Sequence, residues 1–272
     1  MVVDPSLLAA GWPGEPVVVV SAWRDGAWST LASWGDLDAP RPWASVTKLV
    51  TALAGAVEVD AGRADPGDVV LAGGVTLAHL LAHASGLGME EGDPVVAPGT
   101  KRVYSNLGID LAAAHLAAGS EVAAWLHDRV LAPLSMSSTR LEGRASEGLV
   151  GPTRDLVRLA REWVRPTLIT PSRRDATTTT FLPELAGIVP GFGRFTPCAW
   201  GLGVEVRGDK RHWMGEWPAE SFGHFGRSGA LALMNVAEGL CLVATSTVAF
   251  AGWAHELWPV WTSQVRDVAG AT

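Results

Sequence analysis

Short apolar runs typical of β-strands lie near both ends of this 272-residue chain. Residues 17–20 are four consecutive valines, and the turn Arg24-Asp25-Gly26 separates them from a second strand-like run at 27–34, so this region predicts a β-hairpin. Similar runs recur near the other end, separated by turn residues: 201–206, 221–224, 230–236 and 240–246. We expect the strand-like runs from the N- and C-terminal parts to form one antiparallel sheet, because the apolar face of a sheet must be buried against other elements.

Helical spacing dominates the middle of the chain. The predicted helices cover residues 45–57, 76–84, 109–118, 121–131 and 152–163, and another helix closes the chain at 253–265. Residues 167–193 are rich in Pro, Thr and Gly, so we expect an irregular segment there, and whether it forms a lid stays open. The predicted fold is therefore α/β (α+β): an antiparallel sheet domain from residues 1–60 and 194–272, flanked by helices, with a mainly helical insert at 61–193.

Charge and composition narrow the functional class. Lys and Arg number 21 and Asp and Glu 28, so the net charge is −7 and no basic stripe for nucleic acid or anionic membranes is present. The N-terminus lacks the basic and apolar regions of a signal peptide, and we expect a cytoplasmic protein without a membrane segment. The two cysteines and the pair His79 and His83 do not form a metal-ligand set, so we expect neither metal nor cofactor.

The segment Ser45-Val46-Thr47-Lys48 carries the first chemical signal. Lys48 is the only charged residue between Arg41 and Glu58, and its helix is otherwise apolar. A buried ammonium is costly, so burial should lower the pKa of Lys48 and let it accept a proton. Residues three apart share a helix face, which puts Lys48 within reach of the Ser45 hydroxyl at the helix N-terminus. These residues predict an activated serine nucleophile, although a chance match with Lys48 reaching solvent is the simpler alternative.

Two further motifs follow along the chain. Tyr104, the only tyrosine, lies two residues before Asn106; a phenol near a cation can act as a base, and an asparagine can contact both Lys48 and a substrate carbonyl. The alternative is a tyrosine in a turn that begins the next helix. His224-Phe225-Gly226 lies in a strand-like segment, where Gly226 would let the backbone approach a substrate closely.

The order S-x-x-K, Y-x-N and H-x-G resembles the serine β-lactamase and penicillin-binding-protein superfamily. The tyrosine in the second motif is similar to the class C branch, with its D-alanyl-D-alanine carboxypeptidases and family VIII carboxylesterases. Flanking segments add to the resemblance: 80–87 is similar to the family's LLTHTSGL, and 97–108 to its PG…YSNxG. The resemblance covers nearly the whole chain.

The resemblance implies a role for each motif residue. Ser45 would attack a carbonyl and form an acyl-enzyme, while Lys48 and Tyr104 move the proton and Tyr104 activates the water that releases the acyl group. Asn106 would orient the substrate, and the backbone N–H groups of Ser45 and Arg227 would form the oxyanion hole, beside His224 and Gly226. Trp43 and Phe225 are weaker candidates for lining an acyl pocket.

His224 stands where most β-lactamases have a lysine, and an unperturbed histidine is mostly neutral at pH 7. We therefore favour hydrolysis of a small ester or amide over a true β-lactamase or D-Ala-D-Ala carboxypeptidase acting on a β-lactam or peptide. Arg227 would supply the missing charge only if it faces the cleft. A catalytically idle binding or assembly module on the same fold is the alternative of another class. The oligomeric state stays open.

Overall fold

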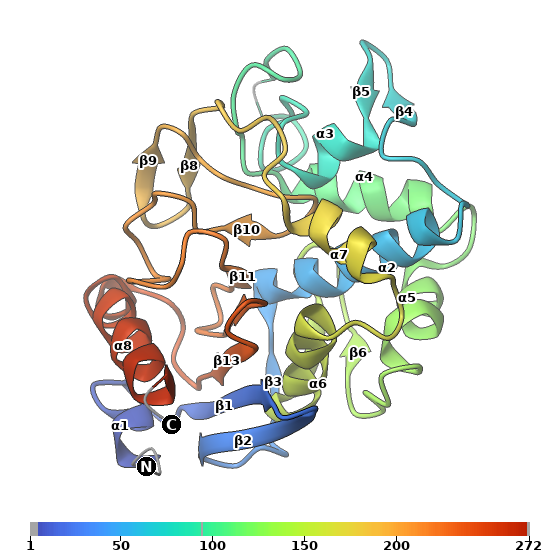
Figure 1. Ribbon diagram of the computed structural model, residues 1–272. Helices are drawn as coiled ribbons and strands as arrows, with labels where there is room; N and C mark the ends of the chain where they lie inside the picture. Colours follow the sequence, from blue (N-terminus) through green and yellow to red (C-terminus); the bar gives the residue numbers. More distant parts are fainter. Residues whose placement is uncertain (1–4, 94, 271–272) are drawn as a thin grey trace.

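The computed structural model describes residues 5–93 and 95–270, and both ends of the chain meet in one six-stranded antiparallel sheet (Figure 1). The strand order is β10-β11-β12-β13-β1-β2, so the N-terminal hairpin lies beside the last strand. The strands are β1 (Val17–Arg24), β2 (Ala27–Trp34), β10 (Glu205–Val206), β11 (Phe222–Phe225), β12 (Leu231–Asn235) and β13 (Leu240–Thr245). The predicted fold class, with a sheet built from both ends, is confirmed; the division into two domains stays a prediction.

Alternate side chains of the sheet enter two separate hydrophobic cores. Val19 and its partner Val243 face the core that contains α6 (Thr153–Val164) and α2 (Thr47–Asp60). Val18 and Leu242 face the opposite core, against the tryptophans of α8 (Gly252–Gly270). Successive side chains of a strand point to opposite faces, so strands covered on both faces are apolar throughout. This explains the uninterrupted valine run of β1.

Helices and small sheets surround this centre (Figure 1). α2 is buried along almost its whole length and contacts neighbouring helices on several sides, as its apolar sequence predicts. The remaining helices are α1 (Pro5–Ala9), α3 (Leu77–Leu81), α4 (Asn106–Leu116), α5 (Val122–Leu126) and α7 (Pro171–Thr178). The small sheets contain β3 (Pro40–Pro42), β4 (Val69–Leu71), β5 (Val75–Thr76), β6 (Arg140–Leu141), β7 (Leu149–Pro152), β8 (Gly187–Val189) and β9 (Gly193–Phe195). Within residues 5–93 and 95–270, no helix has the length and apolarity needed to cross a membrane.

Three segments differ from the prediction. Residues 167–193 are not irregular throughout, because they contain α7 and β8; Thr170 caps α7 by accepting from the Arg173 N–H, with Pro171 in the first turn. The strand predicted at 201–206 is reduced to Glu205–Val206, since Gly203 has a φ of +85° and packs against α2. The helix predicted at 121–131 is α5 followed by a π-helical turn, His127–Leu131.

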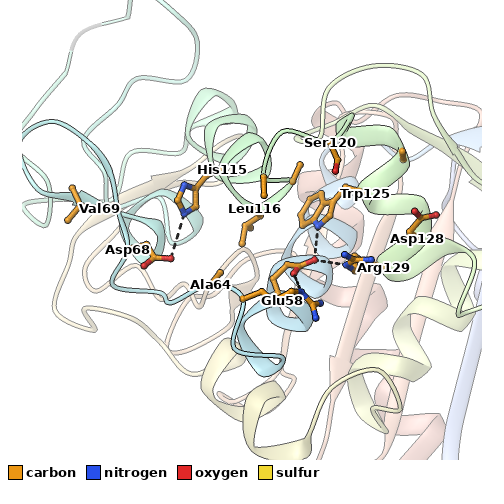
Figure 2. A pocket seen from close by; sticks show the side chains of 14 residues that line it. Glu58, Ala64, Asp68, Val69, His115, Leu116, Ser120, Trp125, Asp128 and Arg129 are labelled. Atoms are coloured by element: carbon orange, nitrogen blue, oxygen red, sulfur yellow. Dashed lines mark hydrogen bonds and ion pairs between the residues drawn. The ribbon is translucent and has the colours of Figure 1, made fainter.

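Glu58 anchors the C-terminal end of α2 in a hollow of about 590 Å³ (Figure 2). Its carboxylate accepts hydrogen bonds from Arg63, Arg129 and Trp125 Nε1, the last at 3.0 Å. Burial alone would raise the pKa of Glu58, but these three donors outweigh it and lower the pKa below its ordinary value. Figure 2 shows Trp125 and Arg129 converging on this carboxylate, and with Arg63 they fix the far end of the helix that begins near Ser45.

Glu58→Gln should destabilise the fold by about 1–3 kcal/mol, because Trp125 and two arginines lose a charged acceptor. A lowered carboxylate pKa contributes stability above the unfolded pKa and loses it as the pH falls through the folded value. Urea unfolding at pH 7 and pH 3 measures this, with the exposed Glu142→Gln as control. Equal stability of Glu58→Gln and the wild type at pH 7 would contradict the anchor.

Candidate active site

A tight turn presents Ser45 at the entrance to α2. Residues Ala44–Val46 form a 3₁₀ turn, and Ala44 has a φ of +45°, a left-handed conformation that is strained for a residue with a side chain. Trp43 does not line the pocket as expected. The turn directs it into the core, where it is fully buried and its Nε1 donates to the Gly151 carbonyl at 3.1 Å.

Lys48 is fully buried one helical turn after Ser45. Its Nζ lies 3.2 Å from Ser45 Oγ, 2.7 Å from Asn106 Oδ1 and 2.8 Å from the Ser146 carbonyl oxygen. Burial lowers the pKa of Lys48 to about 7, although the nearby carboxylates of Glu147 and Asp110 oppose the shift. The neutral amine is therefore accessible near neutral pH.

The partners of Lys48 leave one direction for proton exchange. Asn106 Oδ1 and the Ser146 carbonyl can only accept, so each requires one N–H of Lys48. The third position of Nζ faces Ser45 Oγ. This position holds a proton in the ammonium form and a lone pair in the amine form, so a proton can pass between Ser45 and Lys48 without any other contact breaking.

Tyr104 is the second side chain that contacts Ser45 Oγ, in addition to Lys48. Its hydroxyl donates to Ser45 Oγ at 2.9 Å, and Lys48 Nζ lies 4.8 Å from the centre of its ring. Burial raises the pKa of the phenol. The expected role of Tyr104 as a base is not favoured in the free protein, because desolvation raises its pKa more than the hydrogen bond with Ser45 and the charge of Arg227 lower it. Ser105 caps α4 by accepting from the Gly108 N–H, so the motif also begins a helix, as the alternative interpretation held.

Asn106 is held in one orientation by a charged network. Its Nδ2 donates to Glu90 Oε1 at 2.9 Å, which leaves Oδ1 for Lys48. Glu90 is paired in turn with Arg144, which also contacts Asp110. One N–H of the Asn106 amide thus serves the protein and only the other is available to a substrate. The sequence motif did not reveal Glu90 or Arg144, since both lie outside it and are common surface residue types.

The end of β11 packs against the nucleophile turn (Figure 1). A Cβ on Gly226 would lie 2.3 Å from the Trp43 carbonyl oxygen and 3.1 Å from the Ser45 nitrogen. The close approach expected for Gly226 therefore exists, but toward the protein's own turn. His224 Nδ1 donates to the Phe225 carbonyl at 2.7 Å, and its Nε2 is buried without a partner among the described residues. Burial and the proximity of Lys48 lower the pKa of His224 to about 3, so it is neutral.

The candidate active site opens into a pocket of about 250 Å³. Ser45, Tyr104, Asn106, His224, Phe225 and Arg227 line it, so the pocket brings together most of the predicted site. Its apolar wall adds Met89, Val189, Pro190, Gly191, Trp200 and Phe250. Residues 189–191 belong to the segment 167–193, for which the sequence did not decide whether it forms a lid. They form part of the pocket wall. The Arg227 side chain is 80% exposed and lies 3.5 Å from Glu147.

A buried charge cluster was not predicted, and its carboxylate, Glu205, reaches the lining of the pocket. The carboxylate of Glu205 is paired with Lys210 at 3.0 Å and His212 at 2.8 Å, and it accepts from Trp213 Nε1. Burial alone would raise the pKa of Glu205, but Lys210 and His212 hold it well below its ordinary value. Lys210 is one of only three lysines, which was the available signal.

The histidine pair considered for a metal has other roles. His79 Nδ1 lies 2.9 Å from the Thr76 hydroxyl at the start of α3, whereas His83 Nδ1 accepts from the Ser105 N–H at 3.1 Å and its ring packs 4.6 Å from that of Tyr104. No cluster of three metal-ligating side chains occurs in the described part of the chain. His83 thus helps to hold residues 104–106 in place.

Gly226→Ala should lower both stability and activity. The new methyl group must displace the Trp43 carbonyl and with it the Ser45 turn, and such overpacking typically costs about 1–3 kcal/mol. Thermal unfolding and the rate of Ser45 acylation measure the two effects. Gly252→Ala is the matched control, since a Cβ there meets nothing within 4 Å. Wild-type values for Gly226→Ala would show that the turn tolerates the displacement.

Comparison with known proteins places this geometry in a family. Residues 9–259 match the Beta-lactamase family. A β-lactamase from Mycobacterium bovis is 34% identical, with a TM-score of 0.92 over 97% of this chain and 99% of that one. Simvastatin synthase from Aspergillus terreus (15% identity, TM-score 0.78, 99% and 100% covered) and a D-stereospecific amidohydrolase from a Streptomyces species (18%, 0.68, 94% and 98%) share the fold.

The curated proteins give no match to this sequence. The family match nevertheless spans most of the chain, and the Mycobacterium bovis protein is similar over nearly its full length. The chain belongs to the β-lactamase family, whose fold its hydrolase neighbours share.

Proposed function

We propose that this protein is a serine hydrolase that cleaves a small ester or amide through an acyl-enzyme on Ser45. The observation that carries the proposal is the contact of three groups: Ser45 Oγ lies 3.2 Å from Lys48 Nζ and 2.9 Å from the Tyr104 hydroxyl. A nucleophile within hydrogen-bond reach of a base that is itself oriented by other groups is the recurring arrangement of covalent catalysis.

Lys48 is the base in the acylation step. Ser45 Oγ forms a bond to the carbonyl carbon while its proton passes to the neutral Lys48 amine, and the bond from that carbon to the leaving oxygen or nitrogen breaks. The leaving group takes a proton from Tyr104, and Tyr104 regains one from the third N–H of Lys48, the position that faces Ser45 Oγ and is not held by Asn106 or Ser146. In the second step water adds to the acyl carbon and its proton passes to the neutral Lys48 amine. The bond between this carbon and Ser45 Oγ then breaks, Ser45 Oγ takes the proton from Lys48, and the acid leaves. The route begins at Lys48 because its pKa lies near 7, whereas the pKa of Tyr104 is raised.

Backbone donors stabilise the oxyanion in this proposal. The Arg227 N–H has no acceptor within residues 5–93 and 95–270, and Gly226 holds that strand end against the Ser45 nitrogen. Two such donors aimed at one oxygen favour the tetrahedral intermediate over the flat carbonyl. The scheme needs neither metal nor cofactor.

A true β-lactamase or D-Ala-D-Ala carboxypeptidase is the second candidate, and the name of the Mycobacterium bovis relative favours it. Against it stands His224, which is neutral and buried and so offers no fixed positive charge to a substrate carboxylate. A catalytically idle module is disfavoured because the contacts among Ser45, Lys48 and Tyr104 are all present.

The proposal predicts labelling and turnover that depend on Ser45. A fluorophosphonate should add one adduct per chain to the wild type and none to Ser45→Ala, as intact mass spectrometry shows. Hydrolysis of p-nitrophenyl butyrate should fall by at least about a thousandfold in Ser45→Ala. Nitrocefin run in parallel tests the second candidate. Equal ester turnover by the wild type and Ser45→Ala would overturn the proposal.

The pH dependence of ester hydrolysis tests the role of Lys48. Only the deprotonated amine accepts the Ser45 proton, so kcat/KM should rise about tenfold per pH unit in acid and level off above a midpoint near the pKa of about 7. A pH series from 5 to 9 with a neutral ester measures the midpoint. A rate that stays constant across this range, or that falls as the pH rises through 7, would exclude Lys48 as the base.

A further inference from the structure

We infer that the pocket selects substrates with an ammonium group close to the reacting carbonyl, and that Glu147 is the residue that binds this group. The inference rests on the proposed acyl-enzyme function and adds the charge of the substrate to it. Three observations carry it: the buried cations near the pocket are already engaged, the side-chain groups not assigned to the substrate carbonyl are acceptors, and Glu147 lies where the pocket opens.

The buried cations near the reaction centre have no free position for a substrate carboxylate. The three hydrogen-bonding positions of Lys48 Nζ are occupied by Ser45 Oγ, Asn106 Oδ1 and the Ser146 carbonyl oxygen. Lys210 lies behind the pocket wall, 3.0 Å from Glu205 and 2.7 Å from the Ala199 carbonyl oxygen. The Arg227 side chain lines the pocket but is 80% exposed and lies 3.5 Å from Glu147, so water screens its charge. A carboxylate in the pocket would therefore lose its hydration without gaining a buried counter-charge.

Apart from the Asn106 and backbone N–H groups assigned to the substrate carbonyl, the polar groups that remain free in the pocket are acceptors. The Phe225 carbonyl can only accept, so His224 carries its proton on Nδ1 and presents a lone pair at Nε2. This Nε2 is buried, lacks a partner among the described residues, and belongs to a side chain that lines the pocket. A buried acceptor without a donor is unfavourable, so a ligand that brings an N–H relieves the cost. The carboxylate of Glu147 is the second acceptor, and Arg227 at 3.5 Å is its one ion-pair partner within the described chain.

Glu147 lies at the border between the pocket and the solvent. It lines the 250 Å³ pocket and also an open hollow of about 570 Å³ that continues past Arg227. Its side chain is 30% exposed, so an incoming ammonium ion can reach it without crossing the apolar wall. The pocket is small, and a cation bound to Glu147 would therefore remain close to the carbonyl held at Ser45. A partly desolvated ion pair is much less screened than one in water.

Three p-nitrophenyl esters of similar size separate charge from shape. The butyrate is neutral, the β-alanine ester replaces its terminal methyl group by an ammonium, and the hemisuccinate carries a carboxylate there. We expect kcat/KM for the β-alanine ester to exceed that for the butyrate by about tenfold, after correction for spontaneous hydrolysis, and that for the hemisuccinate to be lower by about tenfold. A hemisuccinate that reacts faster than the butyrate would overturn the inference.

Two variants, one that removes the negative charge of Glu147 and one that removes the positive charge of Arg227, test whether Glu147 binds the ammonium group. Glu147→Gln should bring the ratio of β-alanine ester to butyrate close to one, whereas Arg227→Gln, which frees the Glu147 carboxylate, should raise it. The ratio cancels any effect on the proton transfer of Lys48, because both esters use the same enzyme. Glu142→Gln is the matched control, since Glu142 lines only the outer hollow and is paired with Arg140. It should leave the ratio unchanged.

The outcomes distinguish the two levels of the argument. If the wild type hydrolyses the butyrate through Ser45 but shows no preference for the β-alanine ester, only the substrate charge is wrong. A preference that survives in Glu147→Gln overturns the assignment to that residue. If no ester acylates Ser45, the proposed function fails and this inference falls with it.

Discussion

The structure of the site depends on keeping one amine away from water. Lys48 lies on a helix that is apolar around it, and desolvation brings its pKa to about 7. Two obligatory acceptors, Asn106 Oδ1 and the Ser146 carbonyl, leave a single position of Nζ for Ser45. The same burial that costs folding free energy therefore creates a group able to take a proton from a hydroxyl near neutral pH.

The rest of the fold supplies the partners of this amine from distant parts of the sequence. α2 carries Lys48 and is held at its far end by Glu58. The start of α4 brings Tyr104 and Asn106, and the end of β11 presses Gly226 against the Ser45 turn. Since β11 belongs to a sheet made from segments near both ends of the chain, residues far apart in the sequence support the site.

The sequence was informative at positions where an unusual residue or run of residues has a single physical explanation. The lone lysine on an apolar helix, the single tyrosine and the valine run predicted the core of the site and the sheet. It was uninformative where function depends on tertiary placement: Trp43 turned into the core, because the left-handed Ala44 cannot be read from composition. Glu90, Glu147 and the Glu205–Lys210 pair gained their roles only through long-range contacts. Desolvation of Tyr104, which raises its pKa, is likewise a property of the packed structure.

The central claim is that Lys48 titrates near neutrality, and NMR can measure this directly. The chain has only three lysines, so selective ¹³C labelling of lysine gives few signals, and a Lys48→Arg sample assigns the one of interest. The account predicts that the Lys48 side-chain resonance shifts with a midpoint near pH 7. A resonance that stays at the ammonium position up to about pH 10, where free lysine titrates, would contradict it.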